Sequence, residues 1–303
     1  MERVLFTGKH LLNILNNSHK KVAFFVTYIS QLCYIVNRAV KRVKMSNIAI
    51  TIIGIAFIFL MTTLGSLVVF IFKRLIKDKI KSLMLGFASG LMIATSVWSM
   101  LLPAISQSEG YGVFSFLPAT LGVILGCLFL VVLDKIIPWI LSRKKEDEGN
   151  YVKSQKLFLA VTIHNIPEGL AVGLAFGSAF VVGQTSAFLS ALWLAVGIGI
   201  QNFPEGTTVA LTIKDMTGSR KRGFWYGFLS GVVEPIVAVL GIFLATIISQ
   251  IMPWLLSFAA GAMLFVVVEE LMPDIKVADK GKIGSWGFIA GFILMMILDV
   301  AFG

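Results

Sequence analysis

Long apolar stretches separated by short polar clusters dominate the pattern of this chain. A helix needs about 20 apolar residues to cross the hydrocarbon core of a bilayer. Eight stretches reach this length: 47–72, 83–105, 116–141, 157–180, 185–213, 224–249, 254–272 and 284–302. Lipid offers the backbone no hydrogen-bond partner, so each stretch is predicted to be helical. The stretches lack the alternation of transmembrane β-strands. The pattern predicts an all-α polytopic membrane protein with eight core transmembrane helices.

Composition agrees with this class, because 57% of the 303 residues are hydrophobic and only 14% are charged. Such a chain is too apolar for a soluble domain. The pattern divides it into a basic N-terminal segment, residues 1–46, and a transmembrane transport domain, residues 47–303. Residues 22–36 are apolar but short, with basic residues on both sides. They fit either an extra N-terminal helix that spans the membrane or an interfacial helix, and the sequence leaves both open.

The positive charge alternates between successive loops and so indicates how the chain is oriented in the membrane. The net charge is +10, and the seven loops between the eight stretches carry five, no, five, no, four, no and three lysines or arginines. By the positive-inside rule, the odd-numbered loops face the cytoplasm and the C-terminus lies outside. The excess charge is therefore expected to contact membrane lipids, with no nucleic acid as partner. The plasma membrane is the expected location.

The eight stretches also suggest internal symmetry. The fourth and fifth share a repeated motif, while three stretches precede them and three follow. An odd number of spans in each outer group reverses the orientation of the second group. The layout predicts a 3+2+3 inverted-repeat arrangement.

The repeated motif is a hexapeptide, which reads HNIPEG at residues 164–169 and QNFPEG at residues 201–206. A charged side chain at mid-membrane costs about 2.5–3.5 kcal/mol on insertion scales, so each glutamate requires a functional reason. Residues four apart share one face of a helix, which puts His164 beside Glu168 and Gln201 beside Glu205. The proline of each copy frees a backbone carbonyl and predicts a kink. The two copies together predict a metal centre.

The missing counter-charge and the types of ligand narrow the choice of metal ion. The sixth stretch adds Glu234, followed by Pro235, whereas the spans contain almost no lysine or arginine. One imidazole with several carboxylate and amide oxygens suits Zn²⁺, Cd²⁺, Fe²⁺ or Mn²⁺. The lack of thiolates argues against Cu(I) and against a closed structural zinc site. Asp134 and Asp299 are expected to cap or pair near helix ends. Oxygen-rich coordination permits release, as a transporter requires.

At these residues the chain resembles the ZIP (Zrt/Irt-like) family of divalent-metal transporters, and within it the GufA-like branch. The resemblance covers about residues 47–303. It rests on the two hexapeptides, on GVVEP at 231–235, on AAGAM at 259–263 with the acidic pair that follows, and on the closing LDVAFG at 298–303. It implies eight core helices, a homodimer, and a binuclear metal centre between the fourth and fifth helices.

Carried over by position, the resemblance implies two adjacent metal sites. The first would use His164, Glu168, Gln201 and Glu205. The second would use Asn165, Asn202 and Glu234, with Glu168 and Glu205 bridging. Some bacterial members have aspartate where this chain has Asn202. With asparagine, three carboxylates leave two divalent ions with one positive charge in excess, which predicts a weaker second site.

The resemblance also suggests pathway residues and a mechanism. Glu270 and Glu269 on the seventh helix would lie near the pathway, and Met100 on the second would be a soft contact at its entrance. The predicted function is zinc uptake toward the cytoplasm by alternating access, with the metal-binding helices moving as a block against a scaffold. Carboxylates that share a site titrate as a coupled group, so protonation is expected to assist release.

Two other functions compete with this interpretation. A metal-gated channel or a non-transporting sensor could use the same ligands. An intramembrane metallohydrolase usually needs several histidines, as in H-E-x-x-H, and an open position for activated water. This chain has one histidine beyond residue 19 and no such motif, so it is predicted not to be an enzyme.

Overall fold

The computed structural model describes residues 46–71, 78–142, 150–247, 249–273, 275 and 282–302. Within them, eight helical segments are long and apolar enough to cross a membrane, which confirms the predicted fold class. The apolar stretch at 22–36 and the charged run at 143–148 lie outside the described residues. The described residues from Asn47 onward belong to one compact unit.

Five of the spans are continuous helices: α2 (Asn47–Ile71), α5 (Phe116–Ser142), α6 (Asn150–Val182), α7 (Thr185–Thr217) and α12 (Ile283–Phe302). The second span is composite, formed by α3 (Asp78–Ala94), the π-helix η1 (Thr95–Leu101) and α4 (Leu102–Gln107). The sixth consists of α8 (Arg220–Gly231) and α9 (Val233–Ile247). The seventh consists of α10 (Met252–Val266) and the π-helix η4 (Val267–Leu271). Two short 3-10 helices, η2 (Glu109–Phe114) and η3 (Ser249–Ile251), precede α5 and α10.

The interruptions concentrate where polar side chains enter the bundle. Proline at 235 cannot donate to the carbonyl four residues back, and the sixth span breaks there between α8 and α9. The π-helix η4 carries the acidic pair at 269–270. Single-turn π segments often occur at functional sites. The hydropathy pattern predicted each of these spans as one stretch and did not reveal the breaks.

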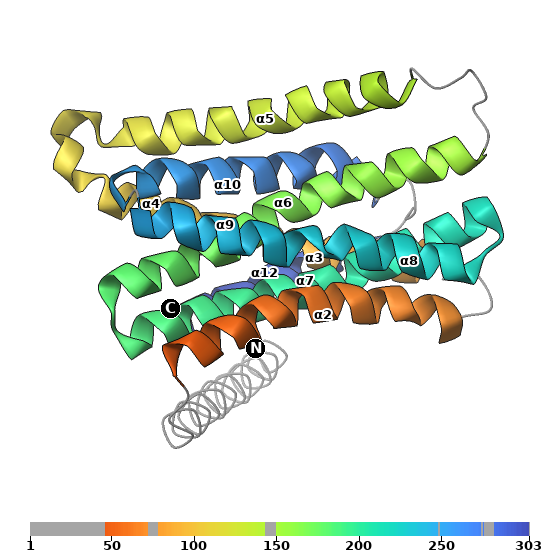
Figure 1. Cartoon of the computed structure of the whole chain (residues 1–303), viewed down its shortest axis with the longest axis horizontal. Coiled ribbons are helices and arrows are strands. Elements are labelled where there is room, and N and C mark those ends of the chain that lie inside the picture. Colours follow the sequence, from red (N-terminus) through yellow and green to blue (C-terminus); the bar gives the residue numbers. More distant parts are fainter. Residues whose placement is uncertain are drawn as a thin grey trace, which may run out of the picture. The chain divides into compact units, whose positions relative to one another are not determined.

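The helices pack in pairs that repeat across the two halves of the chain. The most extensive contacts join α2 to α7, α3 to α12, α6 to α9 and α5 to α10. This set of pairs is symmetric. It is unchanged when the first span is exchanged with the sixth, the second with the seventh, the third with the eighth and the fourth with the fifth. The pairing is the one that an inverted 3+2+3 repeat produces. In Figure 1, α5 and α10 lie along one side of the bundle and α2 along the other.

Glycines allow this close packing. Cβ atoms built at Gly86 and Gly90 of α3 would overlap backbone atoms of α12. Those built at Gly122 and Gly126 of α5 would overlap α10. Small residues let helices in membranes approach until their backbones touch. These four glycines therefore lie where two helix backbones approach closely.

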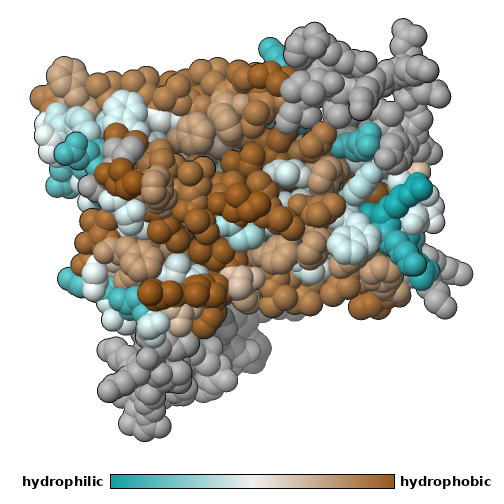
Figure 2. All heavy atoms as spheres, viewed as in Figure 1, coloured by the Kyte–Doolittle hydropathy of each residue, from teal (hydrophilic) through white to brown (hydrophobic). Residues whose placement is uncertain are grey.

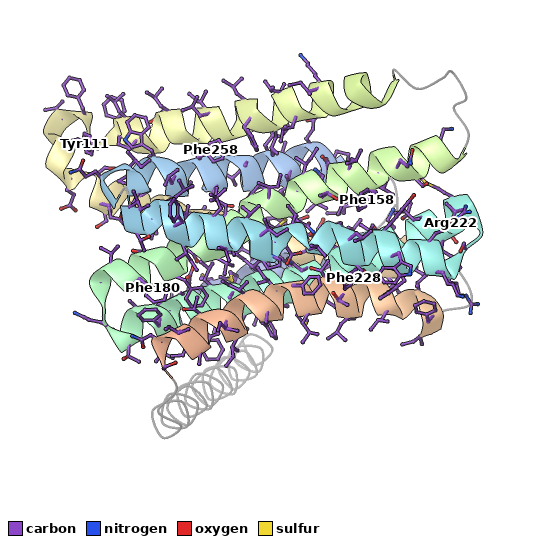
Figure 3. All side chains as sticks on the ribbon, in the orientation of Figure 1. Tyr111, Phe158, Phe180, Arg222, Phe228 and Phe258 are labelled. Atoms are coloured by element: carbon purple, nitrogen blue, oxygen red, sulfur yellow. The ribbon has the colours of Figure 1, made fainter. Side chains whose placement is uncertain are left out.

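The surface has an apolar band and two polar ends. Figure 2 shows the side of the bundle as largely hydrophobic, with hydrophilic residues toward its ends. Because the spans alternate in direction, the starts of α3, α6, α8 and α12 and the end of α7 lie at one end of the bundle. We call it the basic end. Its described lysines and arginines are Lys79, Lys81, Lys153, Lys214, Arg220, Lys221, Arg222 and Lys282. Figure 3 labels Arg222 near this end and Tyr111 at the opposite one, which we call the far end.

Candidate metal centre

The predicted ligands lie on three helices and are withdrawn from solvent. The hexapeptides fall in the middle of α6 and α7, and Glu234 lies in the first turn of α9. Six of the seven predicted ligands are buried side chains: His164, Asn165, Glu168, Gln201, Asn202 and Glu234. The seventh, Glu205, has one buried carboxylate oxygen and lines a cavity. Residues up to 70 positions apart in sequence thus meet in one polar cluster inside an apolar bundle.

One hydrogen bond joins the two hexapeptides directly. The amide Nε2 of Gln201 donates to Oε1 of Glu168 at 2.8 Å. Both residues belong to the first of the two predicted sites. The Gln201 oxygen and the second Glu168 oxygen have no hydrogen-bond partner, so both remain available to a ligand.

A second group of hydrogen bonds forms around Glu234. The Asn165 amide Nδ2 donates to Oε1 of Glu234 at 3.1 Å and to the Ser230 carbonyl at 2.9 Å. The Thr62 hydroxyl of α2 donates to the same Glu234 oxygen at 2.6 Å. The sequence does not reveal this role of Thr62, because a buried threonine in an apolar helix normally bonds to the carbonyl four residues earlier. Here the Ile58 carbonyl lies 3.3 Å from the hydroxyl, and the Glu234 oxygen is the closer acceptor for its single proton.

Unpartnered atoms mark the space that a cation would enter. Seven buried side-chain nitrogen or oxygen atoms in the described part of the chain have no hydrogen-bond partner, and six belong to predicted ligands: Glu168 Oε2, Gln201 Oε1, Asn202 Oδ1 and Nδ2, Glu205 Oε1 and Glu234 Oε2. Buried polar groups in native proteins are nearly always satisfied, and leaving them bare is costly. Five of the six are oxygens, which suit a divalent cation. The cluster has the chemistry of a cation site.

The ligand set requires amide oxygens. Within the described residues, no three histidine, cysteine, aspartate or glutamate side chains converge closely enough to hold a metal ion by themselves. The bare oxygens of Gln201 and Asn202 lie among the carboxylates that the hexapeptides and Glu234 supply. A neutral amide binds a cation more weakly than a carboxylate does. The arrangement suits an ion that binds and leaves, in contrast to a permanent structural metal.

The glycine that closes each hexapeptide holds the helices together at the centre. A Cβ at Gly169 would overlap the backbone carbonyl of Glu234 in α9, and a Cβ at Gly206 would overlap that of Thr62 in α2. The two copies therefore play equivalent packing roles in the symmetric helix pairs. The approach at Gly169 fixes Glu168 close to the turn that carries Glu234.

The three predicted pathway residues lie in different surroundings. Glu270 Oε1 lies in ion-pair contact with His164 Nε2, so η4 reaches the centre. Glu269 is exposed and lines the same cavity as Glu270. Met100 in η1 is fully buried and is not among the residues that line the two cavities described below.

Two cavities lie on opposite sides of the centre. The first, of about 350 Å³, opens at the basic end, and His164, Glu205, Glu269, Glu270, Thr208 and Lys81 contribute to its wall. We call it the basic-end cavity. The second, of about 390 Å³, is lined by far-end portions of α6, α7, α10 and α12 and by η1 and α4. None of the seven predicted ligands lines this far-end cavity.

The far-end cavity contains one carboxylate. Asp299 accepts hydrogen bonds from the Ser99 hydroxyl at 2.8 and 2.9 Å, and both residues line the cavity. The expectation that Asp299 pairs near a helix end agrees with this contact. Its position in a cavity was not visible in the sequence, because Ser99 is 200 residues away.

The chain resembles known zinc transporters over most of its length. A family model described as "ZIP Zinc transporter" matches residues 142–299. The chain is 34% identical to "Zinc transporter ZIP11" of Homo sapiens, over 85% of this chain and 98% of that protein. It is 35% identical to "Zinc transporter GufA" of Myxococcus xanthus, over 80% and 94%. It is 33% identical to "Zinc transporter ZupT" of Streptococcus mutans, over 78% and 92%.

Proposed function

Since this chain belongs to the ZIP family of zinc transporters, we propose that it carries zinc across a membrane toward the cytoplasm by alternating access around the two hexapeptides. The chain is an integral membrane protein that transports divalent metal ions, and it is not an enzyme. The observation that carries the proposed site is the cluster of bare, buried oxygens on Glu168, Gln201, Asn202, Glu205 and Glu234. Zinc is the proposed main substrate, with Cd²⁺, Fe²⁺ and Mn²⁺ as further substrates of the same ligand set.

The charge of the loops and the opening of the centre support this direction of transport. The basic loops favour a cytoplasmic basic end, with the C-terminus outside and the plasma membrane as location. His164 and Glu205 line the basic-end cavity, so a bound ion would leave toward that end. Delivery from outside requires a second conformation that joins the centre to the far-end cavity. Asp299, the carboxylate of that cavity, would attract the incoming cation.

The packing supports a moving block and a scaffold. All seven predicted ligands lie on α6, α7 and α9, and α2 and α8 pack against these helices. The second group, formed by α3, α5, α10 with its continuation η4, and α12, pairs mainly within itself and carries Glu270 and Asp299. Sliding of the first group would bring its ligands from one cavity to the other. The His164–Glu270 contact joins the two groups and would have to break during this motion.

The central test is uptake of radioactive zinc into proteoliposomes that contain the purified chain. We expect saturable uptake, with competition by Cd²⁺, Fe²⁺ and Mn²⁺ and none by Ca²⁺. A metal-gated channel would instead give an ohmic current that rises linearly with voltage, and a sensor would give no flux. Competition by Cu(I) alone would contradict the ligand assignment, because the described centre contains no thiolate.

The second metal site is proposed to be weaker than the first. Asn202 supplies an amide where an aspartate would add a fourth carboxylate. The Asn165 amide and the Thr62 hydroxyl already occupy one oxygen of Glu234, which leaves fewer free acceptors on that side. One site would then bind zinc firmly and its neighbour only transiently.

An Asn202→Asp variant is expected to strengthen the second site by about tenfold or more, equivalent to about 1.4 kcal/mol or more, because it adds a negative charge beside a divalent ion. Calorimetric zinc titration of wild type should give one tight and one weak binding event, and the variant two events of closer affinity. Asn47→Asp, at the start of α2, is the control that adds the same charge away from the centre. Two equally tight sites in wild type would refute the asymmetry.

Two features of assembly complete the proposal. The chain is proposed to act as a homodimer, and the exposed apolar faces of α2, α5 and α9 offer surface to lipid or to a second copy, as at Ile52, Leu128 and Ile236. Membrane lipids are the other partners, with anionic headgroups meeting the lysines and arginines of the basic end.

A further inference from the structure

The basic-end cavity contains a cation of the protein's own. Lys81, in the first turn of α3, lines this cavity together with Glu205, Glu269 and Glu270. It is the one lysine or arginine among the described lining residues. A fixed positive charge is unexpected in the route of a metal ion, since it repels the ion that must pass.

Topology and helix stability do not explain this position. The positive-inside rule accounts for basic residues at this end, but Lys79, Lys153, Lys214 and Lys282 satisfy the rule without lining the cavity. A cation in the first turn also opposes the helix dipole, which favours an acidic residue there, and Asp78 fills that role. Lys81 is half-buried and, unlike those four lysines, lines the cavity.

The charges that line the cavity indicate a role for the lysine. Among the described residues, three carboxylates, Glu205, Glu269 and Glu270, and one ammonium line the cavity. With the lysine, the wall has two net negative charges, which one divalent ion neutralises. Without it, the wall would have three, and a zinc ion that had left the centre would find a strongly attractive site at η4.

We propose that Lys81 is a release residue, whose ammonium lowers the affinity of the basic-end cavity for a divalent cation and so speeds discharge into the cytoplasm. This inference rests on the proposed direction of transport. Lys81 lines the same cavity as Glu269 and Glu270, whose carboxylates would otherwise retain the ion after it leaves Glu205. When the ion has left, the same ammonium offsets part of the negative charge and helps the protein return for the next ion.

The test compares two substitutions at one position. Lys81→Gln removes the charge and Lys81→Arg keeps it. In uptake assays with zinc supplied from outside, Lys81→Gln should lower both kcat and KM, each by about tenfold, because slower release limits turnover and holds zinc longer. Zinc titration of the purified variant should show an additional or tighter binding event. Lys81→Arg and the control Lys79→Gln should match wild type in both measurements.

The outcomes separate this inference from the proposed function. Wild-type chain without zinc uptake would overturn both. Wild-type uptake with Lys81→Gln and Lys81→Arg equally impaired would mean that the side chain is structural, and would overturn the inference alone. Normal turnover and unchanged zinc titration in Lys81→Gln would overturn it as well.

Discussion

Replacing Glu168 with glutamine is expected to abolish zinc uptake, with a loss of at least about 100-fold. Loss of a partner that only supports a ligand typically costs 10–100-fold, so loss of a ligand itself should cost more. Glu168 is fully buried, and its second oxygen is one of the bare atoms of the centre. Glutamine has nearly the same shape and can still accept the Gln201 hydrogen bond. The measurement is initial rate of radioactive zinc uptake at equal amounts of reconstituted protein.

Thermal unfolding distinguishes loss of a ligand from loss of the fold. A buried carboxylate without a cation is costly, so the metal-free Glu168→Gln protein should unfold at the same or a higher temperature than wild type. Zinc at 100 times its Kd should stabilise wild type by about 2.7 kcal/mol and the variant by much less. Glu109→Gln, at an exposed carboxylate in η2, is the matched control. A variant that keeps both uptake and zinc stabilisation would exclude Glu168 as a ligand.

The second large effect is expected at Gly169, the last residue of the first hexapeptide. Gly→Ala inside an exposed helix normally stabilises by up to about 1 kcal/mol. Here the added Cβ would overlap the Glu234 carbonyl and push α6 from α9. Overpacking of this kind costs about 1–3 kcal/mol, and it would separate Glu168 from the turn that carries Glu234. Gly169→Ala should therefore lower the unfolding temperature and reduce zinc uptake to about a tenth or less.

Gly110 provides a control for this effect, because an added Cβ there has free space. A Cβ at Gly110 would have nothing within 4 Å, so Gly110→Ala should leave both stability and uptake unchanged. Gly206→Ala, which meets the Thr62 carbonyl, should behave like Gly169→Ala. Wild-type behaviour of both hexapeptide variants would show that the helices can separate there without consequence.

The hexapeptides illustrate how far local sequence can predict a site. Helical periodicity predicted that His164 and Glu168 share one face of a helix, and ligand chemistry indicated a divalent cation. Both predictions depend only on nearby residues. The structure adds that Gln201 bonds to Glu168 across two helices. It also gives the glycine of each copy a packing role, since its neighbour comes from a distant helix.

Residues that reach the centre from other helices were harder to predict. Glu270 was expected near the pathway only through the family resemblance, and its contact with His164 depends on how η4 meets α6. Thr62, Lys81 and the Ser99–Asp299 pair carry no local signal, because a threonine, a lysine or a serine in a membrane helix has several ordinary explanations. Their roles come from partners on other helices.

By itself, the sequence determined the eight spans, their alternating orientation and the chemistry of the predicted ligands. These properties follow from hydropathy, loop charge and residue type, each of which acts locally against lipid or water. Only the tertiary structure decided which helices pair, that the centre opens toward the basic end, and that Lys81 shares this opening with three carboxylates. Such features depend on the distances between side chains far apart in the chain, which glycine contacts and helix breaks set and hydropathy does not encode.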